Sequence, residues 1–442
     1  MRVLVLVDGE HYPPVTRWGI DVARTLGHEV EAALFVGGVE KVDPHSPPDL
    51  GVPVRLADGD PAGALGRALD ELRPEGVLDL SDEPVLGYRE RMELAAVALA
   101  RGVPYLGADF RFDPPIAGPP LPVPTLGVIG TGKRTGKTAV GAEAARVARE
   151  RGLRPVVVAM GRGGPVEPQV ARAGEVHVEA LLELVRRGEH AASDYLEDAL
   201  TAEVTAIGAR RAGGGLAGAP YATTARAAAE LAVGLGAGLV VLEGSGSAVP
   251  PMPWDAGILV VPATAPPEYL GGYLGPFRLL LTDLVVVTMA RSPTGPENLP
   301  ALRSHVERLR PDARFLVTDF EPVPLGEVGG RDAFLATTAP GPVAARQAAL
   351  LERAHGCRVV GWSARLADRA GLVADMDGAR PYDVLLTELK AAAVDVACER
   401  ALARGAEVVF LRNRPVPVEG DLGVEEAIAG VLELALARSG GR

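Results

Sequence analysis

Two lysines stand in one short glycine-rich stretch of a chain that hardly uses lysine. The chain has 442 residues and 45 Lys+Arg, of which only Lys41, Lys133, Lys137 and Lys390 are lysine. Lys133 and Lys137 both lie in Gly130-Thr-Gly-Lys-Arg-Thr-Gly-Lys-Thr138. Lysine carries a compact point charge, whereas arginine carries a wide planar fork. A lysine retained in such a chain indicates a place where the fork does not fit, such as a loop closed tightly around a phosphate.

This glycine-rich loop lies between a predicted strand, residues 125–129, and a predicted helix that ends at Gly152. Backbone N–H groups of such a loop point at phosphate oxygens, and the helix N-terminus adds about half a positive charge. We expect Lys137 to neutralise β- and γ-phosphate oxygens and the Thr138 hydroxyl to hold Mg²⁺. The candidate nucleotide-binding residues are Thr131, Gly132, Lys133, Arg134, Thr135, Gly136, Lys137 and Thr138.

The loop departs from the pattern G-x-x-x-x-G-K-[ST], because Thr131 stands where the first glycine belongs. Lys133 is expected to reach a phosphate as well. A metal-binding carboxylate is expected at the end of another strand, and Glu243 follows the apolar residues 239–242. The glycines after Glu243 indicate a close backbone approach. We therefore predict that Glu243 binds Mg²⁺ directly or through water; the alternative is a solvated carboxylate at a strand end.

Two further loops combine arginine with glycine and predict a second anion site. Met160-Gly-Arg-Gly-Gly-Pro165 directly follows a predicted strand, and ligands of open α/β sheets bind beyond the carboxyl ends of strands. Its candidate substrate-binding residues, which would form a phosphate nest, are Arg162, Gly163 and Gly164. Within residues 207–216, Arg210 and Arg211 precede three glycines, so we expect a mobile lid over a reacting phosphate. Surface loops with solvated arginines are the alternative.

The N-terminal part of the chain also offers polar residues at a sheet edge. Asp8 and His11 follow the first predicted strand, and Arg89 and Arg91 lie at the start of a helix after the third. These four are candidate substrate-binding residues; ordinary loop polarity is the alternative. Lys390 is the only lysine after Lys137, and its retention in a chain that favours arginine predicts that it also binds an anion of the substrate.

The bulk composition excludes several classes of protein. The net charge of −12 argues against a nucleic-acid binder, although a local cationic cluster can still bind a small anionic substrate. No apolar run reaches the roughly 18 residues of a membrane helix, and residues 1–7 are too short an apolar run for a signal peptide. We expect a cytoplasmic protein with a small phosphorylated partner, with no nucleic acid and no membrane, and leave a homo-oligomer open. Cys357 and Cys398 are expected to be buried small hydrophobes.

Strands alternate with helices along the whole chain, which predicts an α/β fold with parallel sheets and right-handed crossovers. The proline-rich residues 113–124 predict a linker. We predict a Rossmann-like parallel-sheet domain over residues 1–118 that contributes to substrate binding, then a P-loop nucleotide-binding α/β domain over 119–322. An α/β extension is expected over 323–442, and whether it forms a separate domain or completes the central one is open at this point.

The motifs resemble those of the cyclic 2,3-diphosphoglycerate synthetase family. Besides the P-loop, the more specific stretches are Asp8-Gly-Glu-His-Tyr-Pro-Pro-Val15 and Leu385-Leu-Thr-Glu-Leu-Lys-Ala-Ala392. Thr131 is similar to the corresponding residue in the dethiobiotin synthetase branch of P-loop proteins. The resemblance implies that ATP and 2,3-bisphosphoglycerate give the cyclic pyrophosphate, ADP and phosphate, with Mg²⁺ as cofactor.

Repulsion between two highly charged anions would be the main obstacle to such a reaction. Lys137, Lys133, Arg210 and Arg211 would offset it as catalytic residues, since one well-placed arginine contributes about 10³–10⁵ in rate to phosphoryl transfer. We hypothesise that the γ-phosphoryl group moves to one substrate phosphate, and that the neighbouring phosphate then expels inorganic phosphate. The alternatives are another P-loop ligase or kinase for a phosphorylated or carboxylate metabolite, and a nucleotide-switch NTPase that acts on a protein partner.

Overall fold

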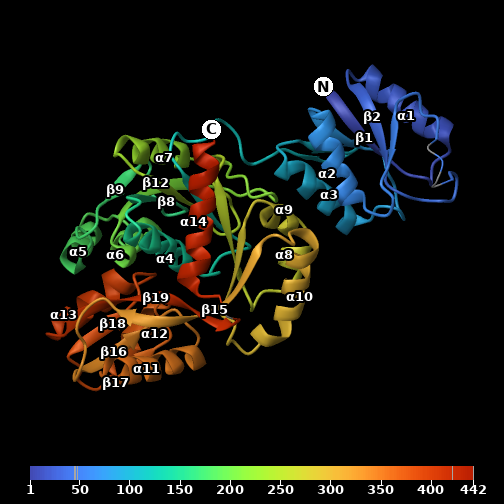
Figure 1. Cartoon of the computed structure of the whole chain (residues 1–442). Helices are drawn as coiled ribbons and strands as arrows, with labels where there is room; N and C mark the ends of the chain where they lie inside the picture. Colours follow the sequence, from blue (N-terminus) through green and yellow to red (C-terminus); the bar gives the residue numbers. More distant parts are fainter. Residues whose placement is uncertain (44–45, 47, 421, 442) are drawn as a thin grey trace.

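The chain folds into two β-sheets flanked by helices (Figure 1). The structure is a computed structural model that describes residues 1–43, 46, 48–420 and 422–441. One sheet is built from residues 2–112 and the other from residues 125–419. The described segment 113–124 connects them and contains no helix or strand, as its prolines predicted.

The N-terminal sheet has six strands in the order β3-β2-β1-β4-β5-β6. All neighbouring pairs are parallel except β5 with β6. Because β1 and β4 are parallel neighbours, the polar residues that follow them lie at one edge of the sheet. The elements are β1 (Arg2–Val7), α1 (Pro13–Thr25), β2 (Glu29–Phe35), β3 (Val54–Leu56), α2 (Pro61–Leu72), β4 (Gly76–Asp79), α3 (Tyr88–Ala100), β5 (Tyr105–Leu106) and β6 (Arg111–Phe112).

The second sheet begins with a parallel core in the order β10-β8-β12-β7-β13-β14-β15. Its strands are β7 (Thr125–Gly130), β8 (Pro155–Gly161), β9 (Gln169–Ala171), β10 (Thr205–Ala212), β11 (Ala222–Thr223), β12 (Leu239–Glu243), β13 (Ala256–Pro262), β14 (Leu284–Thr288) and β15 (Arg314–Pro324). Its helices are α4 (Lys137–Glu150), α5 (Val178–Arg186), α6 (Asp194–Ala202), α7 (Ala225–Gly234), α8 (Glu268–Gly271), α9 (Gly275–Leu280) and α10 (Gly295–Leu309).

The C-terminal strands continue this sheet rather than forming a detached one. β15 pairs antiparallel with β19 (Glu407–Glu419), and β18 (Val384–Thr387), β16 (Asp332–Ala336) and β17 (Arg358–Ser363) follow in parallel. The remaining elements are α11 (Gly341–His355), α12 (Arg369–Asp377), a π-helical turn (Ala393–Cys398), α13 (Glu399–Ala403) and α14 (Val424–Gly440). α14 returns to the central strands, where it lies across the middle of Figure 1. The boundary predicted at 322/323 falls inside β15, which serves both parts; the boundaries remain a prediction.

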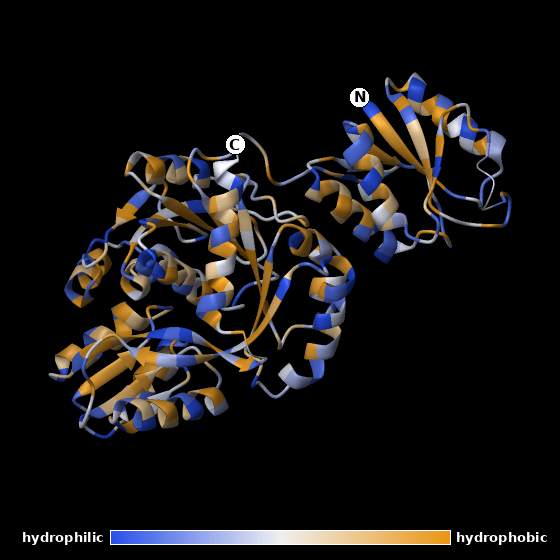
Figure 2. Ribbon diagram, in the orientation of Figure 1, coloured by the Kyte–Doolittle hydropathy of each residue, from blue (hydrophilic) through white to orange (hydrophobic). Residues whose placement is uncertain are grey.

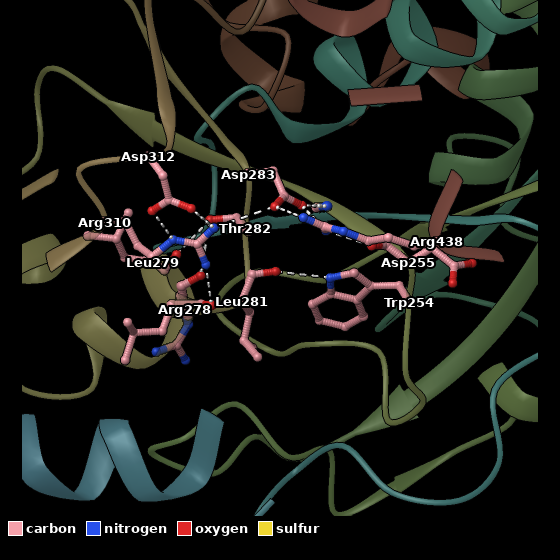
Figure 3. Close-up of polar contacts among 12 residues, drawn as sticks. Trp254, Asp255, Arg278, Leu279, Leu281, Thr282, Asp283, Arg310, Asp312 and Arg438 are labelled. Carbon is pink, nitrogen blue, oxygen red and sulfur yellow. Dashed lines mark hydrogen bonds and ion pairs between the residues drawn. The ribbon is translucent and has the colours of Figure 1, made fainter. Parts of the chain in front are cut away.

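A polar network fixes the returning α14 to the amino edge of the central sheet (Figure 3). Asp283, just before β14, accepts hydrogen bonds from Arg438 of α14 at 2.8 and 3.0 Å and from Arg310 at 3.4 Å. Trp254, near the start of β13, donates from Nε1 to the Leu281 carbonyl at 3.1 Å. The network thus lies at the amino-terminal ends of the parallel strands. The glycine-rich loop lies on the opposite side, at the carboxyl-terminal end of β7.

Hydropathy follows the layers of the fold (Figure 2). Every residue of β8, β12, β13 and β14 is buried, as expected for parallel strands covered on both faces. Cys357 and Cys398 are free and buried, as predicted. Within the described ranges, no helix combines the length and the apolar character needed to cross a membrane.

Candidate active site

The glycine-rich loop closes on its own lysine. Lys137, the first residue of α4, donates from Nζ to the Gly132 carbonyl at 3.0 Å and to Thr135 Oγ1 at 3.5 Å. Thr288 of β14 anchors the loop by donating to the Thr135 carbonyl at 2.7 Å. Gly136 has φ +88°, and a Cβ there would lie 2.5 Å from a ring atom of Phe320. The loop therefore needs glycine at this position and holds the ammonium group inside the curve where phosphates bind in P-loops.

The charge of Lys137 is held in a mostly buried environment of mixed sign. Burial lowers the pKa of Lys137 to about 8, the carboxylates of Glu243 and Asp194 oppose this shift, and the positive charges of Arg211 and Arg278 add to it. Two carboxylates and two guanidinium groups therefore act electrostatically on the buried lysine. An added phosphate would favour the charged lysine and relieve the repulsion among the three cations.

Glu243 lies against α4, next to the P-loop. It ends β12, the neighbour of β7, and its side chain is 3% exposed. A Cβ on Gly141, one turn beyond Thr138, would lie only 1.7 Å from Glu243 Oε1. Burial and then the charge of Asp194 raise the pKa of Glu243 well above its ordinary value. In the part of the chain that the structure describes, Oε1 has no hydrogen-bond partner, which fits a carboxylate that binds a cation.

A second acidic group, on α6, was not predicted. Asp194, Glu197 and Asp198 stand at i, i+3 and i+4 and therefore share one helix face. Asp198 is fully buried, and neither of its carboxyl oxygens has a partner among the described residues. Burial, followed by the charges of Glu243, Glu197 and Asp194, raises the pKa of Asp198 well above its ordinary value. The spacing of the three acidic residues after Ser193 could have revealed this helix face from the sequence. It was missed because no helix was predicted over these residues.

Asp194 also lines a cavity of about 60 Å³ beside the loop that follows β8. Gly163 and Gly164 line the same cavity, together with His190 and Tyr195. The predicted phosphate nest is thus adjacent to the acid of α6 that influences Lys137. No group of three or more His, Cys, Asp or Glu side chains within the described ranges is arranged to hold a metal.

The prediction of a mobile lid for the paired arginines is wrong. Arg210 and Arg211 lie in β10, which pairs with β8 on one side and with β9 and β11 on the other. The strand hydrogen bonds fix both residues, so that the conformational freedom of glycine begins only at Gly213, after the strand ends. Arg210 donates from Nε to the Gly164 carbonyl at 2.7 Å. The first arginine loop and β10 are therefore directly joined.

Arg211 points inward, whereas its neighbours are exposed. Its guanidinium donates to the carbonyls of Gly213 at 2.6 Å and Ser245 at 2.9 Å, and the residue is 9% exposed. Burial and then the charge of Arg162 lower the pKa of Arg211. Arg162 is exposed, as are Lys133 and Arg134 on the P-loop. Arg162 and Arg211 are thus close enough to influence each other, and Arg210 is joined to the loop that carries Arg162.

Three of the four N-terminal candidates, Asp8, His11 and Arg91, form a cluster of their own around residues 81 and 82. Asp8 accepts hydrogen bonds from the backbone N–H of Asp82 at 2.5 Å, and its Oδ1 lies 2.9 Å from His11 Nδ1. Arg91 donates to the Ser81 carbonyl at 2.5 Å, and Arg89 is exposed on α3. Over the described residues, no hydrogen bond or ion pair links this edge to the P-loop. These three candidates are thus joined to one another, whereas the hydrogen bonds and ion pairs of the described residues do not connect them to the P-loop.

Lys390 contacts carboxylates of the protein itself. Its Nζ lies 3.2 Å from Glu197 Oε1 and 3.7 Å from Glu388 Oε2. Although burial acts in the opposite direction, Glu197 and Glu388 raise the pKa of Lys390. The lysine therefore joins the acidic face of α6 to the loop after β18.

The strand-loop-helix at β7 and α4, set in a parallel sheet, defines a P-loop nucleotide-binding protein of the α/β class. Comparison with known families assigns this central domain and the parts on either side of it to one family. Residues 2–113, 125–318 and 324–414 match, respectively, the N-terminal, P-loop and C-terminal domains of cyclic 2,3-diphosphoglycerate synthetase. The chain belongs to the cyclic 2,3-diphosphoglycerate synthetase family, which confirms the resemblance seen in its motifs.

Three relatives illustrate how far the similarity extends. The cyclic 2,3-diphosphoglycerate synthetase of Rubrobacter xylanophilus is 46% identical over 100% of this chain and 98% of its own length. Those of Methanothermobacter thermautotrophicus and Methanothermus fervidus are 42% and 40% identical, each over 98% of this chain and 97% of the relative. The similarity therefore covers all the elements described above.

Proposed function

We propose that this chain is an ATP-dependent ligase that closes 2,3-bisphosphoglycerate into cyclic 2,3-diphosphoglycerate and releases ADP and phosphate. One observation carries the proposal: in a chain with net charge −12, Lys137, Arg211 and Arg278 are all buried, and both arginines donate to the loop after Glu243, whose carboxylate lies against the helix that begins at Lys137. The relatives that carry this name match the chain over nearly its full length. A polyphosphorylated substrate is the ligand that such a centre attracts.

The reaction is proposed to take two displacement steps. An oxygen of one substrate phosphate attacks the γ-phosphorus of ATP, the bond from that phosphorus to the β–γ bridging oxygen breaks, and ADP leaves. An oxygen of the neighbouring substrate phosphate then attacks the phosphorus of the substrate phosphate that received the γ-phosphoryl group. The anhydride bond formed in the first step breaks, and the former γ-phosphoryl group leaves as inorganic phosphate. Lys137 would stabilise charge at the β- and γ-phosphates, and Arg211 would stabilise the substrate phosphates. Lys133 and Arg210 are proposed to add positive charge from the rim of the site.

Mg²⁺ is the proposed metal cofactor. Mg²⁺ is commonly held by one or two carboxylates together with substrate phosphates and water. The Thr138 hydroxyl and the Glu243 carboxylate would hold it, with Asp194 as an additional carboxylate, because Glu243 has an unpartnered buried oxygen. When bound, Mg²⁺ neutralises phosphate charge. The rest of the P-loop, from Thr131 through Gly136, would bind phosphates through backbone N–H groups.

The substrate site is proposed to draw on three segments. Arg162, Gly163 and Gly164 are proposed as one contribution, because Gly163 and Gly164 share a cavity with Asp194 and the charge of Arg162 acts on Arg211. Asp8, His11, Arg89 and Arg91 are proposed as the contribution of the N-terminal domain, and Lys390 as that of the C-terminal part. The location in the cytoplasm stays a prediction from composition.

A phosphorus NMR assay tests the proposal. The enzyme is incubated with ATP and Mg²⁺, with and without 2,3-bisphosphoglycerate, and phosphate release is followed together with new pyrophosphate signals. We expect both to depend on bisphosphoglycerate and to vanish in Lys137→Ala. Arg149→Ala, a change of a half-buried side chain at the far end of α4 that removes an ion pair with Glu203, should leave both unchanged. Equal ATP hydrolysis with and without the second substrate would contradict the proposal.

A further inference from the structure

Two buried arginines near the P-loop lack an acidic partner. Arg211 is 9% exposed and Arg278 is 6% exposed. Neither forms an ion pair with a carboxylate within the described ranges of the chain, and both donate to backbone carbonyls instead. Burial lowers the pKa of Arg278 to about 10. A buried charge is unfavourable unless it is paired, and among the described residues neither guanidinium has a carboxylate in direct contact.

Arg278 connects the two loops that surround Arg211. It donates to the Ser247 carbonyl from Nε at 3.1 Å and from Nη2 at 2.7 Å, and to the Leu216 carbonyl from Nη2 at 3.4 Å. Residues 244–247 directly follow Glu243, and residues 213–218 directly follow the strand of Arg211. One guanidinium therefore ties the loop of the proposed metal ligand to the loop of the proposed phosphate ligand.

The close approach of these loops depends on Gly218. Its φ is +89°, and a Cβ there would lie 2.7 Å from the Ser247 carbonyl oxygen and 3.1 Å from Arg278 Nη2. Only glycine adopts this conformation readily in so little space. The backbone is thus shaped to bring the 213–218 loop onto Arg278.

Arg211 keeps donors available inside this arrangement. A guanidinium has five N–H groups, and Arg211 donates from Nη1 to Gly213 and from Nη2 to Ser245. Its Nε is buried and has no partner among the residues described. The remaining donors suit a tetrahedral oxyanion, since arginine binds phosphate through several parallel N–H groups.

The same helix that carries Arg278 contacts the N-terminal domain. Phe277 and Leu274 belong to one apolar cluster with residues of α3, and so does Ala217 of the 213–218 loop. Arg308 of α10 reinforces the contact through two hydrogen bonds to Glu93 of α3, at 2.6 and 2.9 Å. Figure 3 shows the Arg278 side chain pointing away from the Arg310–Asp312 pair. α9 therefore faces the N-terminal domain with Phe277 and the two loops with Arg278.

We propose that Arg278 is a positioning residue for a phosphate subsite centred on Arg211, and that it links this subsite to the docking of the N-terminal domain. The ligand class is a phosphate dianion. The assignment of that phosphate to bisphosphoglycerate rests on the function proposed above. Arg278 acts by holding the loops and by adding positive charge, and Arg211 makes the contact.

The variant Arg278→Lys tests the proposal, because it keeps the charge but loses the fork that holds two loops at once. Two readouts are measured: the thermal midpoint with and without pyrophosphate, and the KM values for ATP and bisphosphoglycerate. We expect the pyrophosphate-induced stabilisation to shrink and the KM for bisphosphoglycerate to rise about tenfold. The KM for ATP should change by less than about twofold.

Arg146→Lys is the matched control. Arg146 is also a buried arginine, but its guanidinium is paired with Glu143, Glu150 and Glu425. This control should lower the thermal midpoint without changing either KM. If Arg278→Lys does not fold, Gly218→Ala is measured instead, because its Cβ forces the 213–218 loop away from Ser247. This variant should likewise raise the KM for bisphosphoglycerate and leave the KM for ATP nearly unchanged.

Three outcomes would overturn the proposal. An unchanged pyrophosphate effect together with an unchanged bisphosphoglycerate KM would exclude a role at the subsite. An equal rise in both KM values would place the effect at the nucleotide. An effect equal to that of Arg146→Lys would make Arg278 a stability residue only. The pyrophosphate readout does not depend on turnover, so it separates failure of this proposal from failure of the proposed function.

Discussion

The substitution Gly141→Ala should separate the stability of α4 from the function of Glu243. Gly141 lies inside α4, and alanine at such a position favours the helix by about 1 kcal/mol over glycine. The new Cβ would, however, lie 1.7 Å from Glu243 Oε1, whereas ordinary contacts begin at 3.4 Å. The carboxylate must therefore retreat by about 1.7 Å, roughly the gap between these two distances.

Such a displacement is large for a catalytic group. A misplacement of about 1 Å costs about 10²-fold in rate. We therefore expect kcat to fall by at least about 10²-fold and the Mg²⁺ concentration for half-maximal rate to rise. The thermal midpoint should change little, because the gain in helix propensity offsets part of the strain around Glu243.

A Mg²⁺ titration of product formation measures this effect. Gly234→Ala is the control, since Gly234 also lies in a helix but has open space around its Cβ position. It should raise the thermal midpoint and leave the Mg²⁺ dependence unchanged. Adding Glu243→Asp to Gly141→Ala should recover part of the activity, because the shorter side chain relieves the collision. Normal Mg²⁺ dependence in Gly141→Ala would refute the role assigned to Glu243.

Three further predictions follow from charge. Burial lowers the pKa of Lys137 to about 8 in the free protein, so kcat/KM for ATP should fall above about pH 8. The kcat should persist to higher pH, because bound phosphate favours the charged lysine. Coincident pH profiles of kcat and kcat/KM would contradict this. Lys390→Gln should lower the thermal midpoint more at pH 8 than at pH 6. Burial raises the pKa of Glu197 to about 7, and only the ionised Glu197 carboxylate is stabilised by the charge of Lys390. Equal losses at both pH values would contradict the pairing. Arg210→Ala should raise the KM for bisphosphoglycerate more than that for ATP, and equal rises would exclude its substrate role.

Local chemistry made the central part of the site predictable. Glycine and lysine spacing placed Lys137 at a strand-helix junction, and four apolar residues placed Glu243 at the end of a neighbouring strand. Both positions could be predicted because each lies in a short segment whose structure follows from its own residues. Whether Lys137 and Glu243 bind ATP and Mg²⁺ stays a proposal that the experiments above test.

The parts that failed depend on partners distant in sequence. The glycines after Arg211 suggested a loop, but Arg210 pairs with β8 and Arg211 pairs with β11, so both lie in a strand. β19 continues through Pro415 and Pro417 because it pairs with the extended β15, whereas prolines normally argue against a strand interior. Arg278 was missed because a single arginine in a short apolar helix gives no local sign of the two loops that it holds.

Calorimetric titration of 2,3-bisphosphoglycerate into enzyme saturated with Mg²⁺ and a non-hydrolysable ATP analogue shows whether both ligands occupy the site together. We expect a ternary complex, with bisphosphoglycerate binding retained in the presence of the analogue and strongly weakened in Arg211→Gln. Mutually exclusive binding of the two ligands, or unaltered binding in Arg211→Gln, would contradict it.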